Sequence, residues 1–288
     1  MSEGDQDQGS LPSRKRRSWG ARMRARWALI WSSPRLALPL LVRAALETLI
    51  RLTPGGGRTF HDPSQHPWTA ALEAGAPQIR AELEAVLGGW DQIPAFEEIQ
   101  PEQERITHDK RWKTYVFYGY GAWVEPNRAA CPATTALLEA VPGLRAAMFS
   151  ILAPGKQIPP HRGPYAGVLR YHLGLWVPDP ARCGIRVGPD VARWAEGESL
   201  LFDDSYDHEA WNDSEEVRAV LFLDVVRPLP QPLAWLNELL LRGLAQSAFV
   251  KGGQENLRRW YRAQAEASDP EPPDSPSADS TSAEAAAA

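Results

Sequence analysis

The sequence is short of the residue types that mark several common protein classes. Its 288 residues include only two cysteines, Cys131 and Cys183, which lie far apart and match no metal-binding spacing. They are expected to be reduced thiols of an intracellular protein, or at most one disulfide bond. The formal net charge of −5 gives no reason to expect nucleic acid as a partner. The chain is long enough to bury a sizeable core, so one domain with extensions is expected.

Long uncharged apolar runs are also missing. The most apolar stretch, Trp27–Leu52, is interrupted by charged side chains at Arg35, Arg43, Glu47 and Arg51. Its uncharged runs fall well short of the roughly 18 residues that a membrane-spanning helix needs. The stretch follows a basic run but has no small-residue cleavage site, which argues against a secretory signal. A transmembrane anchor and a cleaved leader are therefore both disfavoured.

The N-terminal region nevertheless has the pattern of a surface-binding segment. Arg14–Arg26 is strongly basic, and Arg43, Glu47 and Arg51 recur every four residues, so they share one face of a helix that is otherwise apolar. This pattern fits an amphipathic helix at an anionic membrane surface or a helix packed on the rest of the chain. We expect residues 14–52 to contact a membrane surface, with the chain cytoplasmic and peripheral at the inner face.

The remaining composition favours a loop-rich β fold. The chain has 12 tryptophans and 26 prolines, and short apolar segments alternate with Pro and Gly punctuation. Strands are expected at Trp112–Tyr120, Met148–Leu152, Leu169–Val177, Ile185–Val187, Ser199–Phe202 and Val217–Val226. Helices are expected at Thr69–Leu87, Cys131–Val141, Leu233–Val250 and Asn256–Ala267. Many short strands with such turns are typical of a sandwich or jelly-roll barrel.

These elements divide the chain into four parts. A basic, amphipathic extension and linker covers 1–58, and the main domain with a β-barrel core covers 59–228. C-terminal helices cover 229–267, and a Pro/Ser/Asp/Ala-rich tail covers 268–288 and is expected to be disordered.

Two of the expected strands carry charged or titratable side chains among apolar ones. Leu169–Val177 alternates, so Arg170 and His172 share one face, while the leucines take the other. If the leucines pack under a covering layer, Arg170 and His172 point into a cavity. Arg218 begins a second, largely apolar strand, and a buried arginine there needs an anionic partner.

Several motifs fall in order over the same region. They are Pro160–Pro164, Leu169–Leu175, Trp194–Glu198, Phe202–Ser205 and His208–Asn212. In these runs the chain resembles the aspartyl/asparaginyl β-hydroxylase family, a branch of the Fe(II)/2-oxoglutarate oxygenases. That resemblance, continuous from about Trp112 to Pro228, implies a mainly β fold with flanking helices around a double-stranded β-helix (jelly-roll or cupin-like) core. The run Pro164–His172 is also similar to the lipid A hydroxylase branch.

The resemblance implies a metal site at two histidines, His161 and His208, which would bind Fe(II). A facial triad usually adds a carboxylate two residues after the first histidine, and Gly163 stands there. The aspartyl/asparaginyl hydroxylases are similar in using two histidines, whereas the lipid A branch more often has an acid at this position. Asp203 and Asp204 are candidates for a substitute ligand or for orienting His208.

The cosubstrates implied are 2-oxoglutarate and O2. Arg218 is the expected clamp for the distal carboxylate, because a guanidinium donates two parallel hydrogen bonds to a carboxylate. By resemblance, Ser150 adds a hydroxyl donor to that carboxylate, His172 lies beside the cosubstrate, and Trp112 forms an aromatic wall. Arg170 is expected to contact either the cosubstrate or an acidic substrate side chain.

Three functions are compatible with these residues. The first is a dioxygenase that hydroxylates an Asp- or Asn-type side chain, or a related carboxylate, of a peptide or amino acid. The second is the same chemistry on a lipid acyl chain at a membrane surface, of the lipid A or ornithine-lipid type. The third is a non-catalytic barrel used for binding, which a complete set of His161, His208 and Arg218 disfavours.

Overall fold

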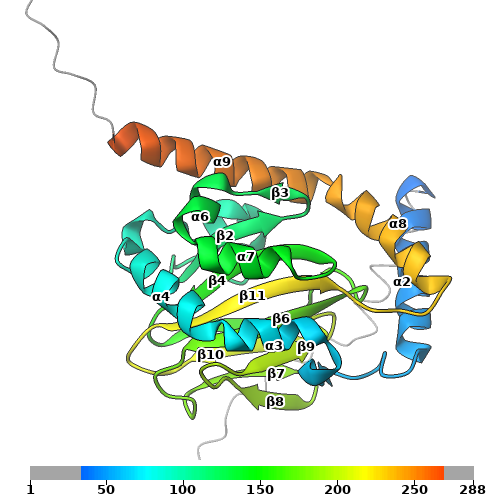
Figure 1. Cartoon of the computed structure of the whole chain (residues 1–288). Coiled ribbons are helices and arrows are strands. Elements are labelled where there is room, and N and C mark those ends of the chain that lie inside the picture. The colour runs from blue at the N-terminus through cyan, green and yellow to red at the C-terminus, as the bar shows by residue number, and fades with distance from the viewer. Residues whose placement is uncertain (1–33, 269–288) are drawn as a thin grey trace, which may run out of the picture.

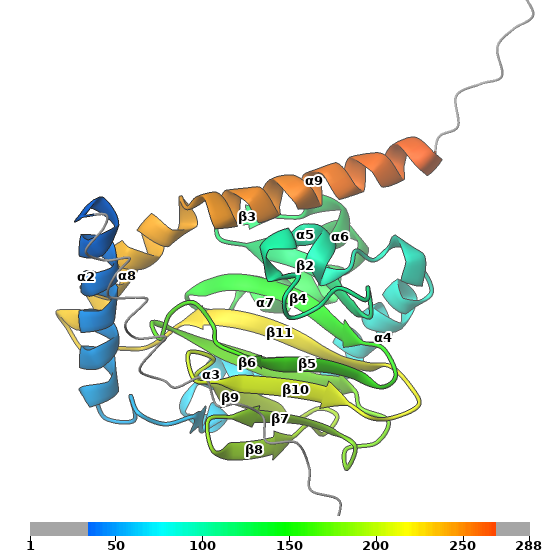
Figure 2. The same cartoon turned by 180° about the vertical axis from the view of Figure 1, so that it is seen from behind.

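Two antiparallel sheets form the centre of the molecule. The computed structural model describes residues 34–268; the basic run to residue 33 and the tail of residues 269–288 lie outside this range. The larger sheet has seven strands in the order β1-β9-β6-β11-β4-β2-β3, and the smaller has four in the order β5-β10-β7-β8 (Figure 2). The expected fold class, a mainly β jelly-roll core with flanking helices, is confirmed.

The strands of the larger sheet are β1 (Phe60–His61), β2 (Trp112–Gly119), β3 (Ala122–Trp123), β4 (Leu144–Leu152), β6 (Val168–Trp176), β9 (Ser199–Phe202) and β11 (Arg218–Val226). Those of the smaller sheet are β5 (Lys156–His161), β7 (Cys183–Val187), β8 (Asp190–Arg193) and β10 (His208–Asn212). Each strand expected from periodicity is present within a few residues of its predicted bounds.

Helices cover the outer face of the larger sheet. They are α3 (Pro67–Ala74), α4 (Ala76–Leu87), α6 (Glu125–Ala130) and α7 (Pro132–Glu139), and Figure 1 shows them in front of the strands. Leu169, Leu173 and Leu175 of β6 are buried under them, together with Ile79 and Leu83 of α4. The predicted alternation of β6 is therefore confirmed, because the leucines pack under the helices and Arg170 and His172 face the smaller sheet.

The helix bounds differ from the predicted ones in two places. The segment Thr69–Leu87 forms two helices that meet at Gly75, where a Cβ would lie 2.4 Å from the Leu137 side chain. The C-terminal helices break earlier than expected, into α8 (Leu233–Ala245) and α9 (Ala248–Ser268). Gly252 and Gly253 do not end a helix, since Gly253 instead lets α9 approach Gln100, whose amide would lie 2.1 Å from a Cβ.

Short helical turns fill the loop expected at residues 88–111: η2 (Trp90–Gln92), α5 (Phe96–Ile99) and η3 (Pro101–Gln103), while η1 (Pro63–Gln65) follows β1. At the other end of the molecule α2 (Pro34–Leu52) packs on α8 (Figure 1), with Leu46, Ile50 and Leu241 buried between them. Within residues 34–268, no helix is long and apolar enough to cross a membrane. Cys131 and Cys183 are both free and buried.

Candidate active site

His161 and His208 are cross-strand neighbours in the smaller sheet. His161 ends β5 and His208 begins β10, and the register of this antiparallel pair places the two residues opposite each other. Their ring centroids are 4.1 Å apart, and His208 is buried. The sheet therefore brings together two imidazoles that are 47 positions apart in the chain, as a shared metal ion requires.

Backbone carbonyls fix the tautomer of both histidines. Nδ1 of His161 lies 2.8 Å from the carbonyl oxygen of Pro159, and Nδ1 of His208 lies 3.0 Å from that of Tyr206. A carbonyl only accepts hydrogen bonds, so Nδ1 of each ring carries the proton. Nε2 of each ring then has a free lone pair, which is the arrangement that metal-binding histidines use.

Burial keeps both rings uncharged at neutral pH. It lowers the pKa of His161, and it lowers the pKa of His208 to about 3, with the neighbouring His161 adding to the effect. A histidine must be neutral to bind a metal ion, so these shifts favour ligation across the physiological range.

Gly163 fits against the carboxylate of Asp204. A Cβ at Gly163 would lie 2.0 Å from Oδ2 of Asp204, and the Gly163 amide donates a 2.8 Å hydrogen bond to the Asp204 carbonyl. The Asp204 carboxylate thus occupies the space that an acidic side chain at position 163 would need. Among residues 34–268, no group of three or more His, Cys, Asp and Glu side chains is placed to hold a metal ion.

The two adjacent aspartates have different surroundings. Asp204 lies 2.8 Å from Arg170, which also contacts Asp224 through two hydrogen bonds of 2.9 and 3.2 Å. Asp203 instead pairs with Arg227 at 2.5 Å, in the buried interior. Only Asp204 therefore faces Gly163, and burial raises its pKa while Arg170 opposes the shift.

Arg218 is buried without a carboxylate. It is 1% exposed, its guanidinium lies 4.3 Å from the Trp194 ring centroid, and its Nε and Nη1 have no hydrogen-bond partner. Within the described part of the chain no acidic side chain forms an ion pair with it. Burial lowers the pKa of Arg218 to about 10, which still leaves it charged at neutral pH.

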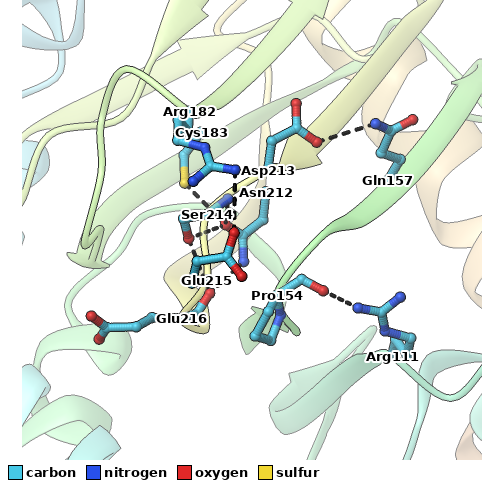
Figure 3. A network of polar contacts seen from close by, with 10 residues as sticks. All are labelled: Arg111, Pro154, Gln157, Arg182, Cys183, Asn212, Asp213, Ser214, Glu215 and Glu216. Atoms are coloured by element: carbon cyan, nitrogen blue, oxygen red, sulfur yellow. Dashed lines mark hydrogen bonds and ion pairs between the residues drawn. The ribbon is translucent and has the colours of Figure 1, made fainter.

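A polar network fixes the turn that leads into Arg218, and Figure 3 shows its part from Asn212 to Glu216. The Asn212 amide donates to the carbonyls of Leu152, Ala153 and Glu216, at 3.0, 3.1 and 2.8 Å. Its oxygen accepts from Ser214 at 2.6 Å. These bonds connect the end of β10 to the end of β4. Arg218, the first residue of β11, pairs with Leu152 at that end of β4, so the network holds Arg218 in its place on the inner face.

The other predicted cosubstrate residues line the same inner face. The Trp112 indole donates a 3.0 Å hydrogen bond to the Ser150 hydroxyl, and its ring stacks on Phe96 at 4.1 Å. His172 is buried with neither ring nitrogen hydrogen-bonded. Burial, and then the Arg218 charge, lower its pKa well below the usual value. His172 contacts the rings of Trp194 and Phe202, which in turn approach Arg218 and His208.

A cavity of about 570 Å³ opens beside His161, while His208 is not among the residues that line it. His161, Gly163, Arg170 and Asp204 line one end, and apolar side chains of β2, α5 and α9 line most of the rest. Arg218 and His172 do not line it. The sequence analysis predicted neither this cavity nor the contact of Asp224 with Arg170. The available signal for the cavity was the spacing of Leu257 and Tyr261, which are four residues apart and therefore share one face of a helix.

Comparison with known proteins finds similarity to hydroxylases. The family model described as aspartyl/asparaginyl beta-hydroxylase matches residues 73–228. The chain is 45% identical over 216 residues to an ornithine lipid ester-linked acyl 2-hydroxylase from Rhizobium tropici, which covers 74% of this chain and 77% of that protein.

Two further similarities are more partial. The human aspartyl/asparaginyl beta-hydroxylase is 36% identical over 133 residues, or 44% of this chain and 17% of that protein. The cupin domain of Schizosaccharomyces pombe Cnp3 aligns with 41% of this chain and 66% of that one, at 9% identity and a TM-score of 0.29. From the family model and the Rhizobium relative, both of which span more than half of its length, this chain belongs to the aspartyl/asparaginyl β-hydroxylase family of hydroxylases.

Proposed function

We propose that the protein is an Fe(II)- and 2-oxoglutarate-dependent dioxygenase that hydroxylates carbon 2 of a lipid acyl chain of the ornithine-lipid type. The observation that carries this proposal is the position of the His161–His208 pair. His161 lines a mostly apolar cavity, and ring contacts through Phe202, His172 and Trp194 connect His208 to Arg218, a buried arginine that lacks an anion. The cavity suits a hydrocarbon, and the surroundings of Arg218 suit a dicarboxylate.

The residues present fit a bound iron. Nε2 of His161 and of His208 would hold it, since both Nδ1 atoms are engaged with carbonyls and both rings are neutral. When bound, Fe(II) with 2-oxoglutarate and O2 supplies the oxidising power: one oxygen atom goes to succinate as CO2 leaves, and the other becomes the product hydroxyl. The bond between Gly163 and Asp204 holds the two histidine-bearing segments together.

The residues around Arg218 fit the distal carboxylate of 2-oxoglutarate. Two orphaned guanidinium nitrogens are the donors that a carboxylate would accept from. The Ser150 hydroxyl accepts from Trp112, so its own proton remains available as a third donor. The unpartnered ring nitrogens of His172 lie between this pocket and His208, where they would contact the rest of the cosubstrate.

The similarity to the Rhizobium tropici enzyme supports a lipid substrate. An acyl chain is also what the apolar cavity lining suits, because Ile99, Val116, Leu257 and their neighbours offer few polar partners. Arg170 is neutralised by two carboxylates, which leaves it poorly suited to bind an acidic substrate side chain.

An Asp- or Asn-type side chain is the second candidate. The family model and the human relative carry that activity in their names, and Arg162 lines the cavity beside His161 as a possible partner for a carboxylate. A binding module without catalysis is disfavoured, because such a barrel has no need of neutral paired histidines and an anion-deficient arginine together.

The helix α2 supports contact with a membrane surface. Its charged residues Arg43, Glu47 and Arg51 are turned partly toward the protein, where Arg51 stacks on Tyr206 at 4.7 Å. Two of its apolar residues, Leu46 and Ile50, are buried, but others face outward, with Leu41 45% and Leu49 49% exposed. The outer face therefore carries an exposed apolar patch, which suits insertion into a lipid headgroup layer. We propose a peripheral protein at the cytoplasmic face.

The activity test measures succinate from 2-oxoglutarate with and without added iron, and ornithine lipid hydroxylation by mass spectrometry. His208→Ala should abolish both products and lower bound iron. Iron content and turnover equal to the wild type would overturn the assignment. Lipid left unmodified while an Asp- or Asn-containing peptide gains one oxygen would favour the second candidate.

The membrane test is co-sedimentation with vesicles containing an anionic lipid. Replacing Leu41 and Leu49 with serine removes outward apolar groups without touching buried Leu46, so the bound fraction should fall. Val191→Ser on β8, an apolar residue that is 57% exposed and away from α2, is the matched control. Equal pelleting of all three proteins would contradict the proposal.

A further inference from the structure

Helix α9 forms the roof of the cavity beside His161, with mainly apolar side chains and with Gln254, Arg258 and Arg262 also in the lining. Val250, Gly253, Leu257 and Tyr261 line it and recur at intervals of three and four residues, so they occupy one face of the helix. Val250 and Leu257 are buried, whereas Lys251, Arg259 and Ala263 on the other faces are exposed. The roof comes from a segment C-terminal to the catalytic barrel, which Figure 1 shows crossing above β2 and β3.

The floor of the cavity is the inner part of the larger sheet. Val116 and Tyr118 of β2 and Met148 of β4 line it, and Trp123 and Val124 close one side. Among the charged residues of the lining, Arg170 is paired with Asp204 and Asp224 next to His161, whereas Glu125, Arg258 and Arg262, which α6 and α9 contribute, are exposed. A ligand that fits this shape is long and apolar, with its polar end at the histidines.

We propose that this cavity binds the hydrocarbon tail of the substrate and that α9 sets the longest chain accepted. The inference rests on the proposed function, because hydroxylation at carbon 2 places the carboxyl end of the chain at the histidines. All carbons beyond carbon 2 must then extend away from the metal site, and the α9 cavity is the apolar space that begins there. Leu257, buried in the roof, is the specificity-determining residue.

The test is binding of hydrocarbon chains to the full-length protein without metal or cosubstrate. A homologous series of saturated fatty acids would displace a fluorescent fatty acid probe. Each added methylene should tighten binding by up to about fourfold, the equivalent of about 0.8 kcal/mol of buried CH₂. Once the cavity is filled, further methylenes should add nothing, so the plot of affinity against chain length has a plateau.

Two substitutions at one position move that plateau in opposite directions. Leu257→Trp fills the roof and should bring the plateau to shorter chains, while Leu257→Ala opens it and should move the plateau to longer ones. Ala263→Trp adds the same bulk on an exposed face of the same helix and should leave the plateau unchanged. Should Leu257→Trp fail to fold by circular dichroism, Leu257→Ala alone decides.

The outcomes separate this inference from the proposed function. An affinity independent of chain length, or the same plateau in both Leu257 variants, overturns the tail-binding role. A leucine-rich peptide that displaces the probe as tightly as the fatty acids also overturns it, in favour of an apolar peptide. Chain-length-dependent binding that persists in His161→Ala, together with no succinate from the iron-loaded wild type, would retain the cavity's role and reject the hydroxylase assignment.

Discussion

Two arginines face the space between the sheets, Arg218 fully buried and Arg170 14% exposed, and their surroundings differ in one further respect. Arg170 and Arg218 both stack on an aromatic ring, at 4.4 Å from Phe222 and 4.3 Å from Trp194. Arg170 also contacts the carboxylates of Asp204 and Asp224, whereas Arg218 has no acidic partner among the described residues and two guanidinium nitrogens without hydrogen bonds.

The pKa shifts of the two side chains report this difference. Burial lowers the pKa of Arg170, but the two carboxylates outweigh it and raise the pKa above its ordinary value. Burial lowers the pKa of Arg218 to about 10, with little to oppose it. A buried cation without an anion is costly. Arg170 therefore has its counter-charges within the protein, whereas Arg218 lacks the anion that would neutralise it.

The largest effect is expected from removing Arg170, the cation that pairs with Asp204 and Asp224. Arg170→Met leaves Asp204 and Asp224 buried near each other without a cation, so the free energy of unfolding should fall by about 3–5 kcal/mol. Urea unfolding of the metal-free protein measures this change. Asp224→Asn removes one of the two carboxylates but keeps the Arg170–Asp204 pair, and should cost less. A Met variant as stable as the wild type would mean that the network contributes nothing.

The next effect concerns the anion that Arg218 lacks. Arg218→Lys keeps the charge but loses the paired donors of the guanidinium, so binding of 2-oxoglutarate should weaken by about 1.5–3 kcal/mol, or roughly ten- to hundredfold. The apparent cosubstrate affinity in the succinate assay reports it. Arg186→Lys is the matched control, because Arg186 pairs with Glu209 and Asp207 outside the pocket. An unchanged affinity in Arg218→Lys would place the clamp elsewhere.

A smaller effect is expected at Gly163, where the Arg170–Asp204–Asp224 network lies against the His161 segment. Gly163→Ala places a methyl group in the space of the Asp204 carboxylate, which is held by Arg170 and cannot turn away freely. The overpacking should lower the free energy of unfolding by about 1–3 kcal/mol and displace the His161 segment. Loss of bound iron measures the second part. Gly197→Ala is a poor control because its φ is +77°, whereas Gly119→Ala meets no atom within 4 Å and should be nearly silent.

Much of the difference between the two arginines was predictable from the sequence, and part was not. The alternation of Leu169–Val177 placed Arg170 and His172 on the inner face, and the motif order indicated His161 and His208. The sequence did not show that Asp224 would pair with Arg170. The two positions are 54 apart and meet because β11 lies beside β6 with Asp224 opposite Arg170. No hairpin turn joins β6 to β11, so nothing local to either strand says which of their residues will lie opposite each other.

The helices show the same limit. A Gly-Gly pair ordinarily argues for a helix end, so Asn256 was the expected start of the last helix. Packing of Gly253 against Gln100 keeps the helix continuous from Ala248, and this continuity creates the roof of the cavity. The membrane expectation for residues 14–33 lies outside the described residues. In α2, Arg43, Glu47 and Arg51 are partly buried while Leu41 and Leu49 are exposed, the reverse of what an isolated amphipathic helix would suggest.

The smallest effect, and the sharpest contrast with Arg170, is expected from removing Arg218 in the protein without cosubstrate. Since the pKa of Arg218 is about 10 when folded and higher when unfolded, folding opposes protonation of this group. Stability is therefore lost as the pH falls through the interval between the two values, and the penalty is fully present at neutral pH.

Arg218→Met removes that penalty and keeps most of the side-chain volume beside Trp194. The metal-free variant should unfold at the same urea concentration as the wild type or a higher one, whereas Arg170→Met should unfold earlier. Adding 2-oxoglutarate to the iron-loaded proteins at a hundredfold excess over Kd should then reverse the order, stabilising the wild type by about 2.7 kcal/mol relative to iron alone and leaving Arg218→Met as stable as with iron alone. A variant that is destabilised without cosubstrate would show that a partner inside the protein already neutralises Arg218.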